Sequence, residues 1–223
     1  MLHRIILLLV CCCMLTITVS ALGQTILFEK KNLAEWDFYV EEEGMKAEDV
    51  YSFTDDARLL CKGQPFGYLA TKESYKNYKF ALEWRWSEGT RPTNSGVFLK
   101  ITEQPKGSFL PKTVEVQLQY KNAGDIWGFH GRTVTGPEGR FSSQAGNAVT
   151  GQTTGVKKIL DAEKEPGQWN TMEILCVDAL LVVTVNGKIV NWTVGAEPMK
   201  GRIGLQSEGG PIEFRNAVLT TLP

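Results

Sequence analysis

The sequence predicts an all-β protein, a sandwich of two antiparallel sheets, and three observations lead to this class. Apolar residues alternate with period two in short runs, which Gly, Pro, Asn and Asp separate. Gly is abundant, with 22 residues, and 10% of the residues are aromatic. Finally, neither a long helix nor an alternation of strands with helices is visible, which excludes doubly wound and (β/α)₈ architectures.

The expected strands follow one another with short turns between them. From the N-terminus they lie around Phe53 and over residues 58–61, 68–71, 78–86, 96–101, 114–120, 169–177, 180–185, 188–192, 203–207 and 212–219. The clearest pair flanks Asn186-Gly187, a dipeptide that accepts the positive φ values of a type I′ turn. Residues 122–155 are rich in Gly, Ser, Thr and Asn and read as one long loop, of a kind that is usually functional or mobile.

Residues 1–23 have the layout of a secretory signal peptide. His3 and Arg4 precede an apolar run over residues 5–15, and small residues follow. Polar residues interrupt this run too early for a membrane span, which needs roughly 20 apolar residues. Lipid attachment at Cys11 is a weaker alternative, because a lipid-accepting Cys usually follows a small residue. We therefore expect residues 24–223 to form a single domain that is secreted or periplasmic.

Charge and cysteine content limit the partners of the mature chain. The full sequence has 24 Lys and Arg against 25 Asp and Glu, a net charge of -1, so no positive field attracts nucleic acid or an anionic membrane. Three of the five cysteines lie in the leader, and Cys61 and Cys176 remain in apolar runs. These two could form one disulfide bridge or stay as small buried hydrophobic residues. Nothing in the sequence indicates a protein partner.

The most informative polar pattern is Val-Glu-Val-Gln-Leu-Gln at residues 114–119. In a strand, Glu115, Gln117 and Gln119 share one side and the apolar residues face the core. A carboxylate between two amides suits a polyhydroxylated ligand and supplies one base in an uncharged setting. The alternative is an ordinary solvated strand face.

Residues 81–86 divide in the same way. Trp84 and Trp86 share the core side, whereas Glu83 and Arg85 point to the other side. Arg85 could bind a sugar hydroxyl or stabilise an enolate oxygen with its fixed set of donors. It could equally form an ion pair with Glu83.

The long loop carries His130, the only histidine of the mature chain. An imidazole titrates near neutral pH and suits proton transfer, although a single surface histidine is more often incidental. Trp127, three residues earlier, could stack on a sugar face or fix the loop to the core. Asn94 is either a turn residue or a hydrogen-bond donor at the rim of a site.

Motifs for several kinds of chemistry are missing. The sequence contains no Cys-x-x-Cys or His-Glu-x-x-His metal spacing, no phosphate loop and no Gly-x-Ser-x-Gly elbow. It therefore identifies no cofactor and no metal ligand, and it leaves a divalent metal open. Two-carboxylate glycoside hydrolysis would need a second acid about 5 to 9 Å from Glu115, and Glu208 could come near only through the fold.

A set of motifs occurs in order along nearly the whole mature chain. They include Asn32-Leu33-Ala34-Glu35-Trp36, Asn94-Ser95-Gly96-Val97-Phe98-Leu99, Glu115-Val116-Gln117, Gly167-Gln168-Trp169-Asn170, Val185-Asn186-Gly187 and Ile203-Gly204-Leu205-Gln206. Each motif is weak alone, but the ordered set is specific. It resembles the 3-keto-disaccharide hydrolase family, formerly a domain of unknown function and also described as 3-keto-glucoside lyase and 2-hydroxy-3-keto-glucal hydratase.

The resemblance implies a concanavalin A-like jelly-roll sandwich, export, and action on glycosides that carry a ketone at C3. It implies an elimination, in which a base removes the acidic C2 proton, an enolate forms and the C1 substituent leaves, after which water can add. On matching positions, Glu115 would be the base or a ligand anchor, and Lys72 and Arg85 would stabilise the enolate. His130 or Tyr120 would protonate the leaving oxygen.

One departure from the family concerns proton chemistry. Many relatives continue the Leu-Gln pair with Asp-His-Gly, whereas here Gln206 is followed by Ser207-Glu208-Gly209. Glu208 either substitutes for the histidine or marks a member that only binds. We expect an enzyme that cleaves 3-keto-glycosides, with a noncatalytic carbohydrate-binding module or an ordinary glycan hydrolase as alternatives. The expected substrate-binding residues are Gln117, Gln119, Asn94, Trp127, Gln206 and Glu208.

Overall fold

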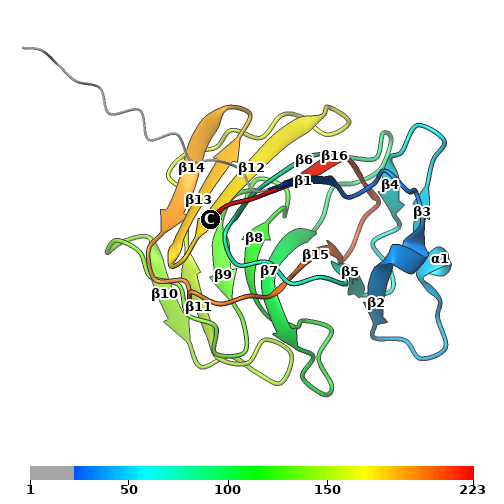
Figure 1. Ribbon diagram of the computed structural model, residues 1–223. Coiled ribbons are helices and arrows are strands. Elements are labelled where there is room, and N and C mark those ends of the chain that lie inside the picture. The colour runs from blue at the N-terminus through cyan, green and yellow to red at the C-terminus, as the bar shows by residue number, and fades with distance from the viewer. Residues whose placement is uncertain (1–22) are drawn as a thin grey trace, which may run out of the picture.

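The protein consists of two antiparallel sheets packed face to face, as a computed structural model of residues 23–223 shows (Figure 1). This architecture confirms the predicted all-β sandwich. The expected leader lies outside the described residues, apart from Gly23 at its end. Within residues 23–223, no helix has the length and apolar character needed to cross a membrane.

Sheet A has the strand order β14-β13-β12-β6-β16-β4-β3, with β1 paired to β16. All of its pairings are antiparallel. Its strands are β1 (Gly23–Ile26), β3 (Tyr51–Phe53), β4 (Leu59–Cys61), β6 (Tyr78–Trp86), β12 (Asn170–Val177), β13 (Leu180–Val185), β14 (Lys188–Thr193) and β16 (Ile212–Thr221).

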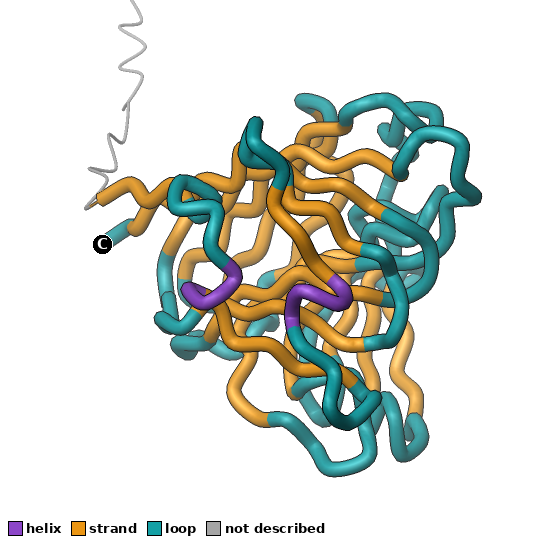
Figure 2. The backbone as a smooth tube through the Cα atoms, turned by 90° about the vertical axis from the view of Figure 1, so that its right-hand side faces the viewer, coloured by secondary structure: helices purple, strands orange, loops and turns teal. Residues whose placement is uncertain are grey.

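Sheet B has the strand order β10-β11-β9-β8-β7-β15-β5-β2 and is also antiparallel throughout. Its strands are β2 (Trp36–Val40), β5 (Gly67–Thr71), β7 (Gly96–Glu103), β8 (Lys112–Gln117), β9 (Ile126–Gly128), β10 (Phe141–Gln144), β11 (Thr153–Val156) and β15 (Arg202–Ser207). The two helical turns, η1 (Leu33–Glu35) and α1 (Ala47–Val50), lie on one side of the sandwich near β2 and β3 (Figure 2).

The strands predicted from period-two patterns are present, although the one expected over residues 114–120 ends at Gln117. The Asn186-Gly187 turn has φ values of 49° and 77°, as a type I′ turn requires. The prediction of one long loop over residues 122–155 is wrong, because the segment contains β9, β10 and β11. These strands have only three or four residues each. Strands this short and rich in Gly, Ser and Thr show no readable alternation, so only their pairing in sheet B defines them.

The main core lies between the sheets. Trp84 and Trp86 are 0% and 1% exposed, and Val114 and Val116 approach the same core from sheet B. The alternation predicted for residues 81–86 is therefore confirmed, and the one predicted for residues 114–119 is confirmed within β8, as far as Gln117. Cys61 and Cys176 are both buried and free, which agrees with the second of the two roles considered for them.

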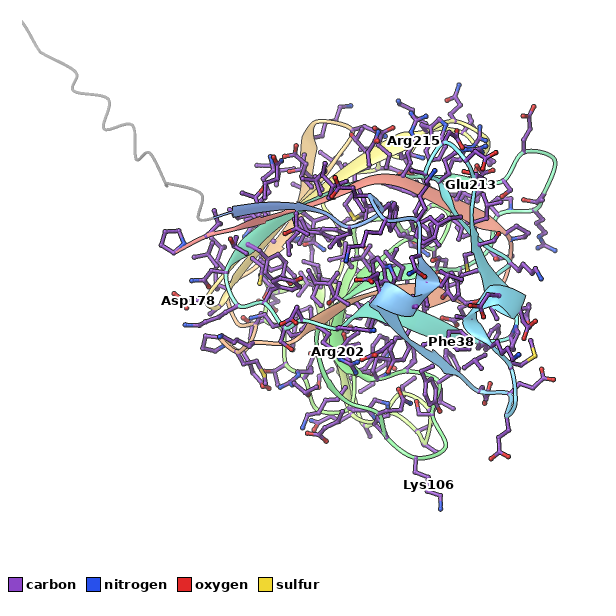
Figure 3. The ribbon with its side chains drawn as sticks, turned by 45° about the vertical axis from the view of Figure 1, so that its right-hand side comes forward. Phe38, Lys106, Asp178, Arg202, Glu213 and Arg215 are labelled. Carbon is purple, nitrogen blue, oxygen red and sulfur yellow. The ribbon has the colours of Figure 1, made fainter. Side chains whose placement is uncertain are left out.

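A network of ion pairs covers the outer face of sheet A. Glu213 on β16 accepts from both Arg58 and Arg85, at 2.6 and 3.0 Å. Arg215, also on β16, pairs with Glu83 instead. The pair between Glu83 and Arg85 considered from the sequence is therefore not formed. Figure 3 shows Glu213 and Arg215 together on this face, at the opposite end of the molecule from Lys106.

Replacing Glu213 by Gln is expected to lower the free energy of unfolding by about 1–3 kcal/mol, because two guanidinium groups lose the charge that they share. The matched control is Glu173→Gln on the same sheet. Glu173 is half exposed and pairs only with Lys79, at 2.8 Å, so its loss should change stability by less than about 1 kcal/mol. Urea unfolding of both variants measures the difference. Equal losses of stability in the two variants would mean that the pairing of Glu213 with two arginines contributes no more than an exposed ion pair.

Candidate functional site

Glu115 on β8 points away from the core, onto the outer face of sheet B. Its register partners are Phe98 on β7 and Trp127 on β9. The carboxyl group bends over the neighbouring Gly96, where an added Cβ would lie 2.0 Å from Glu115 Oε1. Only glycine at position 96 leaves room for the carboxyl group. The space that a side chain at position 96 would fill, here called the seat of Glu115, therefore holds the Glu115 carboxyl group.

Three polar residues, from β15 and from the segments next to β7 and β15, lie near this position. Continuing the register of β7 with β15 puts Gln206 opposite Gly96, and the hydroxyl of Ser95 donates to the Gln206 carbonyl at 2.8 Å. Two residues further on, Glu208 forms an isolated bridge with Asn94. The side-chain amide Nε2 of Gln206 donates to Glu208 Oε2 at 2.5 Å. The fold therefore brings together Glu115, Gln206, Glu208 and Asn94, which are far apart in the sequence.

The two carboxyl groups differ in their surroundings. Glu115 is only 2% exposed, and its Oε1 is enclosed without a hydrogen-bond partner. Burial raises the pKa of Glu115 well above its usual value, and the charges of Glu208 and Asp125 raise it further. Burial also raises the pKa of Glu208, but hydrogen bonds from Asn94 and Gln206 oppose that rise. Because its carboxyl group is enclosed, Glu115 is poorly placed to meet a ligand as the base predicted for it, whereas Glu208 is partly exposed.

A second apolar cluster on the outer face of sheet B explains why Glu115 is buried. Phe98 packs there with Tyr68 from β5, their rings edge to face at 5.6 Å. Phe109 and Leu110, from the segment between β7 and β8, belong to the same cluster. The outer face of sheet B is thus partly covered, and a charged group placed on it is shielded from water.

A hollow of about 410 Å³ lies on the same face of sheet B, and its lining includes Trp127, the register partner of Glu115. The Trp127 indole lies in its wall, with Gly155 of β11 so close that a Cβ there would approach the ring to 2.5 Å. Lys157 Nζ lies 4.9 Å from the Trp127 ring centroid and pairs with the buried Asp125 at 2.7 Å. Uncharged residues line the hollow: Gln117, Trp127, Phe129, Gln144, Gly146, Asn147, Thr150 and Thr153. Such a lining suits a neutral polyhydroxylated ligand.

Other expected site residues lie at the margin. Gln117 lines the hollow, but Gln119 follows the end of β8 and its amide oxygen accepts from Asn122. His130 follows β9, and its Nε2 lies 3.3 Å from Ser108 Oγ. Burial lowers the pKa of His130, which favours the neutral imidazole. Tyr120 donates to Glu165, at 3.4 Å.

Lys72 and Arg85 do not join the group around Glu115. Arg85 belongs to the outer face of sheet A, on the opposite side of the sandwich. Lys72 follows β5, three strands from β8, which is a separation of about 14 Å. Its ammonium group donates to the Ala34 carbonyl beside a separate hollow of about 290 Å³. The expectation that both cations stabilise an enolate formed at Glu115 is therefore not met by this geometry.

Three residues with clear roles in the geometry were missed from the sequence. Gly96 had a usable signal, since an isolated glycine in a strand often marks a close approach of other atoms. Asp125 and Gly155 had none, because both lie in the segment that reads as a loop. Their positions depend on the pairing of β9 with β8 and β11.

Comparison with known structures supports the fold. A crystal structure from Parabacteroides distasonis ATCC 8503, described as a candidate glycosyl hydrolase, is 23% identical, with a TM-score of 0.62, and covers 90% of this chain and 100% of that chain. The Bacillus licheniformis beta-glucanase is 12% identical, with a TM-score of 0.55, covering 89% and 98% of the two chains. The carbohydrate-binding module CBM66 from Bacillus subtilis is 8% identical, with a TM-score of 0.57, covering 84% and 96%. These similarities confirm the jelly-roll sandwich of the concanavalin A-like type.

Comparison of sequences identifies the family. No curated protein matches the chain significantly. The profile of the 3-keto-alpha-glucoside-1,2-lyase-like domain, however, matches residues 23–220, which is almost all of the chain that follows the expected leader. This protein therefore belongs to the family of 3-keto-alpha-glucoside-1,2-lyase-like domains, also called 3-keto-disaccharide hydrolases.

Proposed function

We propose that this protein is a secreted enzyme that cleaves 3-keto-glycosides by elimination. The observation that carries the proposal is the pairing of Glu208 with Gln206 and Asn94 near Glu115, on the sheet face that also carries an uncharged hollow. Membership of the family supports the same substrate class. Secretion is part of the proposal and depends on the leader predicted at residues 1–23.

Glu208 is the base in this proposal. It is partly exposed, unlike Glu115, and two amide groups donate to its carboxylate. A ketone at C3 makes the C2 proton acidic, and Glu208 removes it while the electrons of the C–H bond form the enolate. Re-formation of the ketone expels the substituent from C1 and leaves a C1–C2 double bond. The proton on Glu208 then passes to the departing oxygen, so the carboxylate is restored.

The hollow lined by Gln117 and Trp127 binds the sugar rings. Trp127 offers an aromatic face, and the amide group of Gln117 offers a donor for the enolate oxygen on the same strand face as Glu115. Gln144 and Asn147, from β10 and the turn after it, can hydrogen-bond to hydroxyl groups. Charged side chains are not needed for this recognition.

The experiment compares a 3-keto-disaccharide with its unoxidised parent in heavy water. We expect cleavage of the keto form only, with deuterium incorporated at C2 of the remaining substrate, because elimination begins with removal of that proton. Glu208→Gln should lower the rate about 10²–10⁴-fold. Glu103→Gln, which changes a carboxylate that is 67% exposed at the end of β7, is the control and should leave the rate unchanged.

Two outcomes would contradict the proposal. Cleavage of the unoxidised parent would identify an ordinary glycan hydrolase. Such an enzyme uses two carboxyl groups, and Glu115 and Glu208 would be the candidates. Binding of both sugars without turnover would instead identify a carbohydrate-binding module, which is the role of the Bacillus subtilis neighbour on the same fold.

A further inference from the structure

Three acceptor oxygens in the group around Glu115 are enclosed without a donor: Asn94 Oδ1, Glu115 Oε1 and Gln206 Oε1. Glu115 and Gln206 are the more deeply buried residues, at 2% and 1% exposed. Buried polar atoms are normally hydrogen-bonded, because an unpaired one costs about 1–3 kcal/mol. Two such atoms on deeply buried residues in one region of the sheet therefore need a common explanation.

The register of the strands puts these two oxygens near each other. Glu115 Oε1 lies over Gly96, and Gln206 occupies the position opposite Gly96 on the next strand. Because Gly96 has no side chain, nothing on β7 separates the two groups. The Gln206 amide is also oriented, since its Nε2 donates to Glu208. Its Oε1 therefore points away from Glu208.

No cation offsets the charge of Glu115 among the described residues. The carboxyl groups of Glu208 and Asp125 both act on it unfavourably. Two lysines of sheet B and its margin already have partners, because Lys157 pairs with Asp125 and Lys112, at the start of β8, with Glu103. A proton is the simplest species that neutralises the carboxyl group and also supplies the missing donor.

We propose that Glu115 carries a proton at neutral pH and donates it in a hydrogen bond to Gln206 Oε1, so that Gln206 Nε2 is held on Glu208. The three side chains form a relay in which a neutral acid orients an amide, and the amide stabilises a carboxylate. Glu115 is a positioning residue in this arrangement and does not touch the substrate. Its catalytic consequence rests on the proposed function, whereas the proton and the orientation of Gln206 do not.

The relay has a specific effect on Glu208. A hydrogen bond to the charged form of a carboxyl group lowers its pKa, so the Gln206 amide keeps Glu208 ionised and able to act as a base. Without the donor at position 115, the Gln206 amide can rotate and present its oxygen to Glu208. The carboxylate would then face an acceptor, and its pKa would rise.

Carboxyl carbon NMR of the free protein, with labelled glutamate, tests the relay without a substrate. Glu115 and Glu208 are assigned from the Glu115→Gln and Glu208→Gln variants. We expect the Glu115 signal to remain that of a protonated acid at pH 7. Glu115→Leu should raise the pKa of Glu208 by about one unit, whereas Glu115→Gln should restore most of the wild-type value, because the new amide can still donate to Gln206. The control Glu103→Leu should leave the pKa of Glu208 unchanged.

The pH profile of kcat/KM on a 3-keto-disaccharide adds a functional readout. Its acid limb should move to higher pH in Glu115→Leu by the same amount as the pKa of Glu208, and much less in Glu115→Gln. An ionised Glu115 at pH 7, or a Glu208 titration that Glu115→Leu does not move, would overturn the relay. If the relay is seen by NMR and no 3-keto-glycoside is cleaved, the relay stands and the proposed function fails.

Discussion

Gly96→Ala is expected to lower the rate of 3-keto-glycoside cleavage about 100-fold. The new methyl group would lie 2.0 Å from Glu115 Oε1 and 2.8 Å from its carboxyl carbon, so the whole end of the Glu115 side chain must move. A shift of about 1 Å in a group that supports the reacting residues can cost this much. In the proposed relay, the displaced carboxyl group no longer reaches Gln206, and Glu208 loses its orientation.

The variant also separates positioning from folding. The atoms that the new methyl group meets belong to a side chain, which can swing aside without moving the backbone, so the melting temperature should fall only modestly. Gly23→Ala is the matched control, because a Cβ in β1 would meet only Thr221 Oγ1, at 3.6 Å. Measurements of kcat, KM and melting temperature for both variants distinguish an effect on positioning from an effect on folding. An unchanged kcat in Gly96→Ala would show that the seat of Glu115 is irrelevant to the reaction.

The sequence predicts well what depends on local pattern. Alternation assigned Val114 and Val116 to the core and Glu115 to the other face, and the structure agrees. The same pattern assigned Trp84 to the core, and it is 0% exposed. The Asn186-Gly187 turn has the expected dihedral angles, because its conformation is determined by two adjacent residues.

The sequence predicts poorly what depends on which strands become neighbours. Glu115 and Arg85 look equivalent in one dimension, since each is a polar position on an alternating strand. However, β8 and β6 belong to different sheets, and their outer faces point in opposite directions. The sequence therefore predicted Glu115 and Arg85 in one site, whereas the structure places them on opposite surfaces of the protein. Order within a sheet comes from long-range pairing, which local periodicity does not encode.

The local sequence pattern also does not predict that the candidate site is buried. An outward-facing strand position is normally read as solvated, but the apolar cluster of Phe98, Phe109 and Leu110 covers part of this face. That cover changes the chemistry, because a carboxyl group that would be charged in water holds its proton more tightly. The roles proposed for Glu115 and Glu208 therefore depend on burial that only the tertiary structure shows.

Glu115→Gln is expected to stabilise the protein increasingly as the pH rises. The pKa of Glu115 is raised in the folded state above the 4.5 of an ordinary glutamate, so the folded protein binds a proton that the unfolded chain has lost. Wild-type stability is then complete below about pH 4.5 and falls as the pH rises towards the folded-state pKa. The slope approaches about 1.4 kcal/mol per pH unit for one proton. Glutamine does not titrate, so the variant does not lose stability in this way as the pH rises.

A second carboxyl group supplies the comparison that makes this prediction specific. Burial raises the pKa of Glu163 to about 7, so its contribution to stability is lost between pH 4.5 and about pH 7 and changes little above that. Urea unfolding at pH 5, 7 and 9 should therefore show the benefit of Glu163→Gln levelling off near pH 7. The benefit of Glu115→Gln should keep growing beyond pH 7, because Glu115 is buried more completely and faces the charges of Glu208 and Asp125. A benefit of Glu115→Gln that is the same at all three pH values would mean that Glu115 is ionised in the folded protein, and that its enclosed oxygen has found another partner.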